Sequence, residues 1–219
     1  MASPDPSGGT AIPSTAALSD AMDRIGLECA AIGILPLDDH HRFAGPAFTV
    51  EYAPLRPGSA GTVGDYIDDV EPGSVVVLDN GGRLDCTVWG GILTSVASAR
   101  GVAATVIDGV CRDSAESARL GYPVFARGRT MRTGKDRVEA VSIQTPVHLA
   151  GLRVEPGDMI VGDADGVVVV PADRWPQVLE QARQIERAEA EIERATAGGE
   201  PLADARQRLG YHGLQRGNE

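Results

Sequence analysis

Apolar and polar positions follow two different periods along the first half of the chain. Apolar residues recur at helical spacing from Ser14, which can cap a helix, to Ile25, so a helix is predicted there. Runs rich in β-branched residues, each bounded by Gly, Pro or Asp, predict strands at 47–52, 74–79 and 102–108. The chain therefore opens with a helix and continues with short strands.

Helices separate these strands. Residues 88–100 carry apolar positions at helical spacing and stop at Gly101, which predicts a helix whose first turn contains paired glycines. A shorter helix at 114–120 leads to a strand at 123–126. Alternation of strand and helix is typical of α/β layering.

The last third of the chain is mostly β at first and then helical. Residues 138–147 have strand character, and the runs 159–162 and 167–170 are joined by a short acidic turn, which predicts a hairpin. A long amphipathic helix with Asp173 as its expected cap follows. Its apolar face predicts packing on its own domain or on a neighbouring subunit.

These elements predict one compact layered α/β domain with a long C-terminal helix. We expect a flexible N-terminal arm at 1–13, the domain itself at 14–197, and a short helix with a tail at 198–219. The length of 219 residues is ample for one hydrophobic core.

The charge of the chain narrows the possible partners. Acidic residues outnumber basic ones 31 to 20, giving a net charge of −11, which repels nucleic acid and anionic lipid surfaces. No apolar run approaches the roughly 20 residues of a membrane span, and the N-terminus lacks the pattern of a signal peptide. We expect no nucleic acid and no membrane partner.

Lysine and cysteine usage bears on the chemistry. Lys135 is the only lysine, and it lies in a charged stretch that is expected to be exposed, which disfavours imine catalysis. The three cysteines are far apart and form no C-x-x-C motif, so neither a disulfide framework nor a zinc knuckle is indicated. A reducing cytoplasm is the expected location.

The stretch from Val106 to Glu116 is the most informative part of the sequence. A buried strand is followed there by Arg112 and Asp113, at the carboxyl end of a strand, where open α/β sheets place their sites. Asp113 and Glu116 have the spacing of a capping box, and the same spacing lets both carboxylates face one cation. Arg112 adds a planar group that binds anions.

Paired glycines form a second candidate site. Gly90 and Gly91 open the predicted helix, where a ligand can approach free backbone N–H groups. A simple loop is the alternative. A strand-helix-strand unit would bring Arg112 to the same sheet edge as this turn.

The remaining polar motifs are weaker. The four histidines lack ligand spacing, which disfavours a zinc site. The acidic turn at 163–166 superficially suggests a calcium loop, but the distal glutamate is missing, so a hairpin turn is favoured.

Taken together, these motifs resemble the family of 4-hydroxy-4-methyl-2-oxoglutarate aldolases and the related regulators of RNase E activity. The resemblance rests on the stretches 14–21, 45–47, 89–93, 106–113 and 156–171. It implies a swivelling β/β/α type of layered fold and a homotrimer or homohexamer with sites at subunit boundaries.

The resemblance also implies roles for single residues. It places the metal-binding aspartate at Asp113, a second acidic metal ligand at Glu116, and the substrate-binding arginine at Arg112. The backbone of residues 90–93 would bind substrate; these are Gly90, Gly91, Ile92 and Leu93. Many aldolases of the family have an acidic residue at the position of Gly91, and this chain departs from that pattern.

The activity implied by the resemblance is metal-assisted cleavage of a carbon–carbon bond in a small 2-oxo acid. Retro-aldol release of pyruvate and decarboxylation of oxaloacetate both leave an enolate that a divalent cation stabilises, and oxygen ligands favour Mg²⁺ or Mn²⁺. Two alternatives stay open: a regulator of the same fold without catalysis, and a repurposed enolate-forming enzyme of a specialised pathway. Asp113 favours catalysis, because the regulators lack the metal aspartate.

Overall fold

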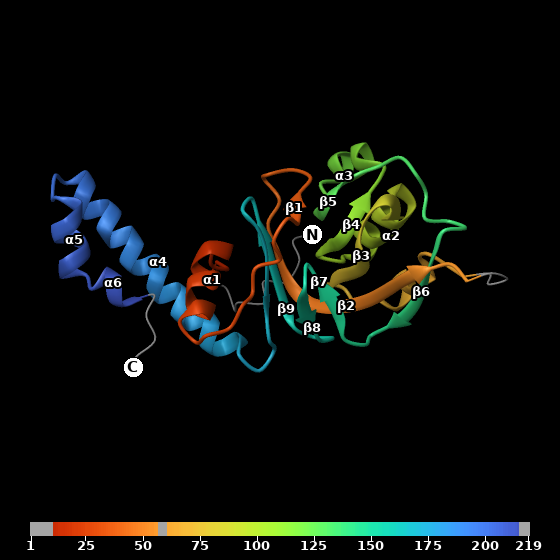
Figure 1. The fold of residues 1–219 in the computed structure, drawn as a ribbon. Helices are drawn as coiled ribbons and strands as arrows, with labels where there is room; N and C mark the ends of the chain where they lie inside the picture. The colour runs from red at the N-terminus through yellow and green to blue at the C-terminus, as the bar shows by residue number, and fades with distance from the viewer. Residues whose placement is uncertain (1–10, 57–60, 215–219) are drawn as a thin grey trace.

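One mixed sheet organises the molecule, as Figure 1 shows. The computed structural model describes residues 11–56 and 61–214, so most of the predicted arm and the last five residues of the predicted tail lie outside the described residues. The helices are α1 (Thr15–Asp23), the short 3₁₀ helix η1 (Asp65–Asp69), α2 (Gly91–Arg100), α3 (Ser114–Leu120), α4 (Trp175–Ala197), α5 (Leu202–Arg208) and α6 (Tyr211–Leu214). The strands are β1 (Leu35–Pro36), β2 (Phe43–Pro54), β3 (Val75–Trp89), β4 (Ala104–Cys111), β5 (Val124–Arg129), β6 (Val138–Ile143), β7 (Val147–Leu149), β8 (Leu152–Val154), β9 (Met159–Asp163) and β10 (Gly166–Val170).

The strand order confirms the predicted α/β class. The sheet runs β1-β5-β4-β3-β2-β9-β10, and β6 also pairs with β2. The pairs β2–β3, β3–β4 and β4–β5 are parallel, whereas β9 and β10 form the predicted antiparallel hairpin. The carboxyl ends of β3 and β4 therefore lie at the same edge, from which α2 and α3 start.

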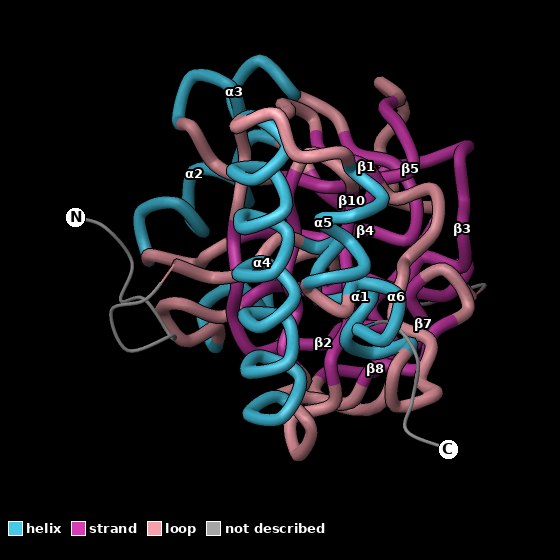
Figure 2. Tube along the Cα trace, turned by 90° about the vertical axis from the view of Figure 1, so that its left-hand side faces the viewer, coloured by secondary structure: helices cyan, strands magenta, loops and turns pink. Residues whose placement is uncertain are grey.

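Apolar residues fill both faces of the parallel strands. In β3, Val76 and Leu78 belong to the core that also holds Ala97 of α2, whereas Val75 and Val77 belong to the core shared with β7 and β8. Successive residues of a strand point to opposite faces, so a continuous apolar run is what a sheet covered on both sides requires. The sheet therefore lies between helix α2 on one face and the β7–β8 hairpin on the other. Figure 2 shows these elements from another side.

The β9–β10 turn anchors the first helix. The Asp163 carboxylate accepts hydrogen bonds from the Thr15 amide at 2.8 Å and the Thr15 hydroxyl at 2.6 Å. It also accepts one from the Asp165 amide, and the Ser14 hydroxyl caps the helix as predicted. The negative charge of the acidic turn therefore stabilises the N-terminus of α1.

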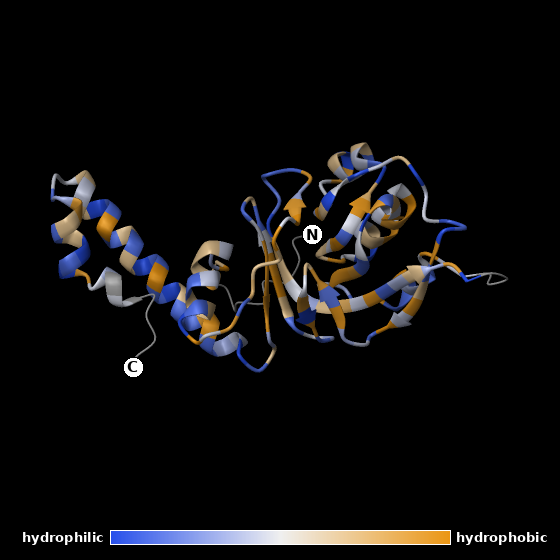
Figure 3. Ribbon diagram, in the orientation of Figure 1, coloured by the Kyte–Doolittle hydropathy of each residue, from blue (hydrophilic) through white to orange (hydrophobic). Residues whose placement is uncertain are grey.

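The long helix α4 packs on α1 through one face and extends past it. Val178, Ala182 and Ile185 join the apolar residues of α1 in a third core, and the other face is polar, as the alternating colours of α4 show in Figure 3. The short helices α5 and α6 fold back along the distal part of α4 in Figure 1. No helix of residues 11–56 and 61–214 combines the length and apolarity needed to cross a membrane.

Two predicted helix starts are wrong. Asp173 does not cap α4, which starts at Trp175 with Arg174 at its cap position and no side-chain capping bond. Val88 and Trp89 end strand β3 instead of starting a helix, because β3 continues through irregular pairing with β4 until Trp89 lies opposite Cys111. Helix α2 begins two residues later, at Gly91.

Candidate functional site

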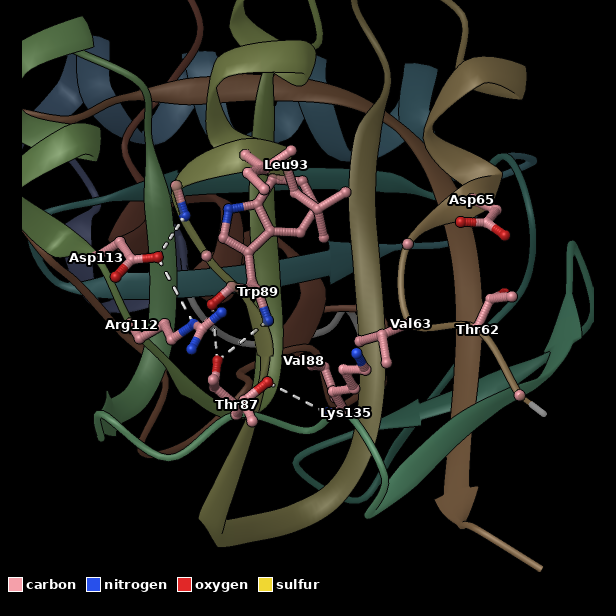
Figure 4. A pocket seen from close by; sticks show the side chains of 16 residues that line it. Thr62, Val63, Asp65, Thr87, Val88, Trp89, Leu93, Arg112, Asp113 and Lys135 are labelled. Carbon is pink, nitrogen blue, oxygen red and sulfur yellow. Dashed lines mark hydrogen bonds and ion pairs between the residues drawn. The ribbon is translucent and has the colours of Figure 1, made fainter. Parts of the chain in front are cut away.

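A cavity of about 490 Å³ lies at the carboxyl ends of β3 and β4 (Figure 4). This is the position at which open α/β sheets place their sites. The described residues that line it are Gly61, Thr62, Val63, Gly64, Asp65, Thr87, Val88, Trp89, Gly90, Gly91, Ile92, Leu93, Arg112, Asp113, Thr133 and Lys135. The cavity therefore contains both of the stretches that the sequence singled out.

Trp89 fixes the turn between β3 and α2. Its side chain is buried, and its indole N–H donates to the Thr94 hydroxyl at 2.9 Å. Thr94 in turn donates through its hydroxyl to the Gly90 carbonyl at 3.1 Å, and the Arg112 amide donates to the Trp89 carbonyl. The start of α2 is thus held by Thr94 of the same helix and by Arg112, which directly follows β4.

The two glycines of this turn differ in the space around them. A Cβ on Gly90 would lie 2.9 Å from Asp113 Oδ2 and 3.1 Å from Arg112 Nε. A Cβ on Gly91 would lie 3.4 Å from its nearest neighbour, the Cβ of Asp113, which is an ordinary contact. Only position 90 therefore needs glycine for the Arg112 and Asp113 side chains to stay where they are.

Asp113 stands in an unusual backbone conformation at the start of α3. Its φ of 56° and ψ of 37° lie in the left-handed region, which Asp and Asn tolerate better than other side chains. Its carboxylate makes no capping bond to α3; instead, Oδ2 accepts from the Gly91 amide at 2.9 Å. The capping-box interpretation of Asp113 is therefore wrong, and its carboxylate joins the first turn of α2.

Arg112 and Asp113 point toward each other in the cavity wall, as Figure 4 shows. Arg112 Nε lies 3.6 Å from Asp113 Oδ2, and the side chains are 40% and 50% exposed, so both remain open to a ligand. The amides of Ile92 and Leu93 lie in the first turn of α2, where a helix leaves backbone N–H groups without intrahelical partners. The Asp113 carboxylate, the Arg112 guanidinium and the N-terminus of α2 thus meet in one wall of the cavity.

The family model described as "RraA-like: Aldolase/RraA" matches residues 15–169 of the chain. This chain belongs to the RraA-like family. The resemblance inferred from the sequence motifs is thereby confirmed.

Relatives in the RraA-like family carry different names. A Halalkalibacterium halodurans protein named "Putative 4-hydroxy-4-methyl-2-oxoglutarate aldolase" is 37% identical over 183 residues, which are 83% of each chain. Protein DlpA of Legionella pneumophila is 39% identical over 199 residues, which are 90% of this chain. The chain spans only 32% of the length of DlpA.

Two solved structures share the fold of this chain. A Pseudomonas syringae protein has a TM-score of 0.83 and 42% identity, with 89% of this chain and 92% of that chain covered. Streptomyces coelicolor RraAS2, described as an unusual member of the RNase ES inhibitor RraA family, has a TM-score of 0.75 and 28% identity, with 81% and 89% covered. The family thus contains proteins named as aldolases and as ribonuclease inhibitors.

Glu116 lies outside the cavity lining in this RraA-like protein. Its carboxylate accepts hydrogen bonds from Arg119 at 2.9 and 2.6 Å and from the Ser95 hydroxyl at 3.1 Å. The bonds from the Arg119 guanidinium hold the pKa of Glu116 down, at about 2. The structure therefore brings Arg112, Asp113 and residues 90–93 together, whereas Glu116 is engaged on the surface of α3.

Lys135 is a charged cavity residue that sequence reasoning did not assign to the site. It is exposed as expected, yet it also lines the cavity, on the side of Thr87 away from Arg112 in Figure 4. Gly134 makes this possible, because its backbone packs so closely on β3 that a Cβ would lie 2.4 Å from the Thr87 carbonyl oxygen. Among the described residues, no carboxylate pairs with the Lys135 ammonium. In the sequence, Gly134 was the one feature near Lys135 that could have indicated its close approach to β3.

A buried tyrosine holds the far wall of the cavity. The Tyr52 hydroxyl donates to the Val63 carbonyl and lies 3.2 Å from the Tyr66 hydroxyl. Burial raises the pKa of Tyr52, so the phenol stays protonated and remains a donor. The wall formed by residues 61–65 is thereby tied to β2.

Proposed function

We propose that this RraA-like protein is a divalent-metal-dependent lyase that cleaves a carbon–carbon bond of a small 2-oxo acid. The reaction would be retro-aldol release of pyruvate or decarboxylation of oxaloacetate. The observation that carries the proposal is the adjacent placement of Asp113 and Arg112 in the cavity wall, against the first turn of α2. The name of the Halalkalibacterium halodurans relative supports the aldolase class.

The donor set of the cavity fits an ion that keeps most of its water. Asp113 Oδ1 accepts no hydrogen bond from any described residue, and half of the side chain is exposed. In the described parts of the chain, no three or more His, Cys, Asp and Glu side chains are grouped so that they could hold a metal ion by themselves. Mg²⁺ is bound in this way, through one or two carboxylates with water and substrate oxygens, and we assign Mg²⁺ or Mn²⁺ to Asp113. The bound ion would polarise the keto oxygen of the substrate as a Lewis acid.

Apart from the metal ion, positive charge at the proposed site comes from Arg112 and from the N-terminus of α2. Breaking the bond leaves an electron pair that the 2-oxo group takes up as an enolate. The Arg112 guanidinium and the N–H groups of Ile92 and Leu93 stabilise oxyanions and carboxylates, because they are fixed donors at a positive helix end. Lys135 adds a further positive charge to the wall and favours anionic substrates.

The proposal keeps the remaining expectations from the family resemblance. Glu116 would act as a second metal ligand only after release from Arg119, so Asp113 is the residue that we assign to the ion. We further propose a homotrimer or homohexamer, in which a neighbouring subunit completes the cavity.

Pyruvate release tests the proposal directly. The protein is incubated with oxaloacetate or a 4-hydroxy-2-oxo acid and Mg²⁺ or Mn²⁺, and pyruvate is measured with lactate dehydrogenase. We expect turnover that exceeds the rate with metal alone and that stops after addition of EDTA. Absence of turnover, combined with capture of a ribonuclease in a pull-down, would instead favour the regulator without catalysis.

The paired glycines give a second test of the same site. Gly90→Ala is expected to lower kcat/KM about ten-fold or more, because the new methyl group displaces Asp113 and Arg112. Gly91→Ala is the matched control and should retain most activity, since its methyl group fits. The test is a comparison of kcat/KM for the two variants by steady-state kinetics. Equal losses of kcat/KM would contradict the assigned geometry.

A further inference from the structure

A second cavity of about 250 Å³ lies between α3 and the segment that precedes β2. The described residues that line it are Leu37, Asp38, His41, Ser114, Ala115, Ser117, Ala118 and Arg129. None of them lines the first cavity, although Ser114 directly follows Asp113. The two cavities therefore flank the start of α3 and are separate.

Arg129 brings an uncommitted positive charge to this second cavity. It ends β5 opposite Cys111, and its Nη2 donates to the Leu37 carbonyl at 3.2 Å. In the parts of the chain that the structure describes, no carboxylate forms an ion pair with it. A guanidinium has five N–H donors in a planar fork that matches a carboxylate. Donors on Arg129 thus remain for an anionic group.

The segment before β2 contributes a negative carboxylate and a histidine ring to the second cavity. The Asp38 carboxylate accepts from the His40 amide at 2.9 Å, and this bond lowers the pKa of Asp38, so the group stays negative. His41 Nδ1 is buried and has no hydrogen-bond partner among the described residues. Burial lowers the pKa of His41, so its ring is neutral near pH 7. The His41 ring therefore adds a neutral polar side chain to the wall of the cavity beside Asp38.

We propose that the second cavity binds a small zwitterion of the α-amino acid class. Arg129 takes its carboxylate, and Asp38, with the neutral His41 ring beside it in the wall, takes its ammonium group. A simple anion would leave Asp38 as a repulsive neighbour, and a simple cation would face Arg129. The cavity is smaller than the 300–1,000 Å³ or so of drug-sized sites, so a molecule with a short side chain fits best.

Calorimetric titration tests whether the second cavity requires both charged groups of the ligand. Glycine and L-alanine carry both groups, acetate carries only the anion, and ethylammonium carries only the cation. We expect the zwitterions to bind about ten-fold or more tightly than either half, because each charged hydrogen bond contributes separately. Binding of acetate as tight as that of glycine, or no heat from glycine at tens of millimolar, would overturn the proposal.

Variants assign the binding to this cavity. Arg129→Met and Asp38→Asn should each weaken glycine binding about ten-fold or more. Arg153→Met removes an equal charge from a surface pair with Glu155, and it should leave binding unchanged. Asp113→Asn should also leave glycine binding unchanged, which separates this cavity from the proposed lyase site. Loss of binding in Asp113→Asn but not in Arg129→Met would refute the assignment.

Discussion

Asp113→Asn is expected to lower metal-dependent pyruvate release at least about a hundred-fold while the protein stays folded. The change removes the negative charge that we assign to the ion, and metal stabilisation of the transition state amounts to several kcal/mol. Asparagine tolerates the left-handed backbone of position 113 at least as well as aspartate, and its side-chain oxygen can still accept from the Gly91 amide. Steady-state kinetics and circular dichroism measure the two effects.

Asp65 offers a matched control, because it is another carboxylate in the wall of the same cavity. Asp65→Asn changes the net charge by the same amount at a distance from Arg112, as Figure 4 shows. We expect it to keep the metal dependence of the wild-type protein. Mn²⁺ titration should show weakened binding only in Asp113→Asn, and an Asp113→Asn protein with full activity would remove Asp113 from the mechanism.

Arg112→Met should cost about a hundred- to a thousand-fold in kcat/KM. Loss of one fixed donor to a developing oxyanion has this size of effect in other enzymes. Arg112→Lys should recover only a small part, because an ammonium group lacks the planar fork that binds two oxygens at once.

The control for this experiment is Arg119→Met. Arg119 pairs with Glu116 on the surface of α3 and does not line the cavity. We expect near wild-type kinetics from it. If Arg112→Lys were fully active, Arg112 would contribute only a general positive charge, and the assigned role as an oxyanion donor would be wrong.

Local patterns predicted most of the elements of this fold. The Ser14 cap, the β9–β10 hairpin and the helix stop at Gly101 follow from side-chain chemistry and glycine conformation within a few residues. The end of β3 did not follow from such a pattern. Val88 and Trp89 fit a helical period equally well, and pairing with β4, which is distant in sequence, decides that they are strand.

The parts of the candidate site that could be predicted are two pairs of adjacent residues. Arg112, Asp113 and the paired glycines could be found because two parallel strands end at one edge. The bond from Gly91 to the Asp113 carboxylate could not, because the same spacing also suits a capping box. Lys135 and the second cavity depend on loops that meet only in the folded chain.

Trp89 gives the protein an intrinsic optical reporter. It lies beneath the cavity with its indole tied to Thr94, while Trp175, the second of the two tryptophans, sits at the start of α4 among different neighbours. In a Trp175→Phe background, tryptophan fluorescence would come only from Trp89, which lies close in sequence to the Ile92 and Leu93 amides that we propose bind the ligand. Occupancy of the first cavity could then be followed in real time, in the unlabelled protein, from a change in emission.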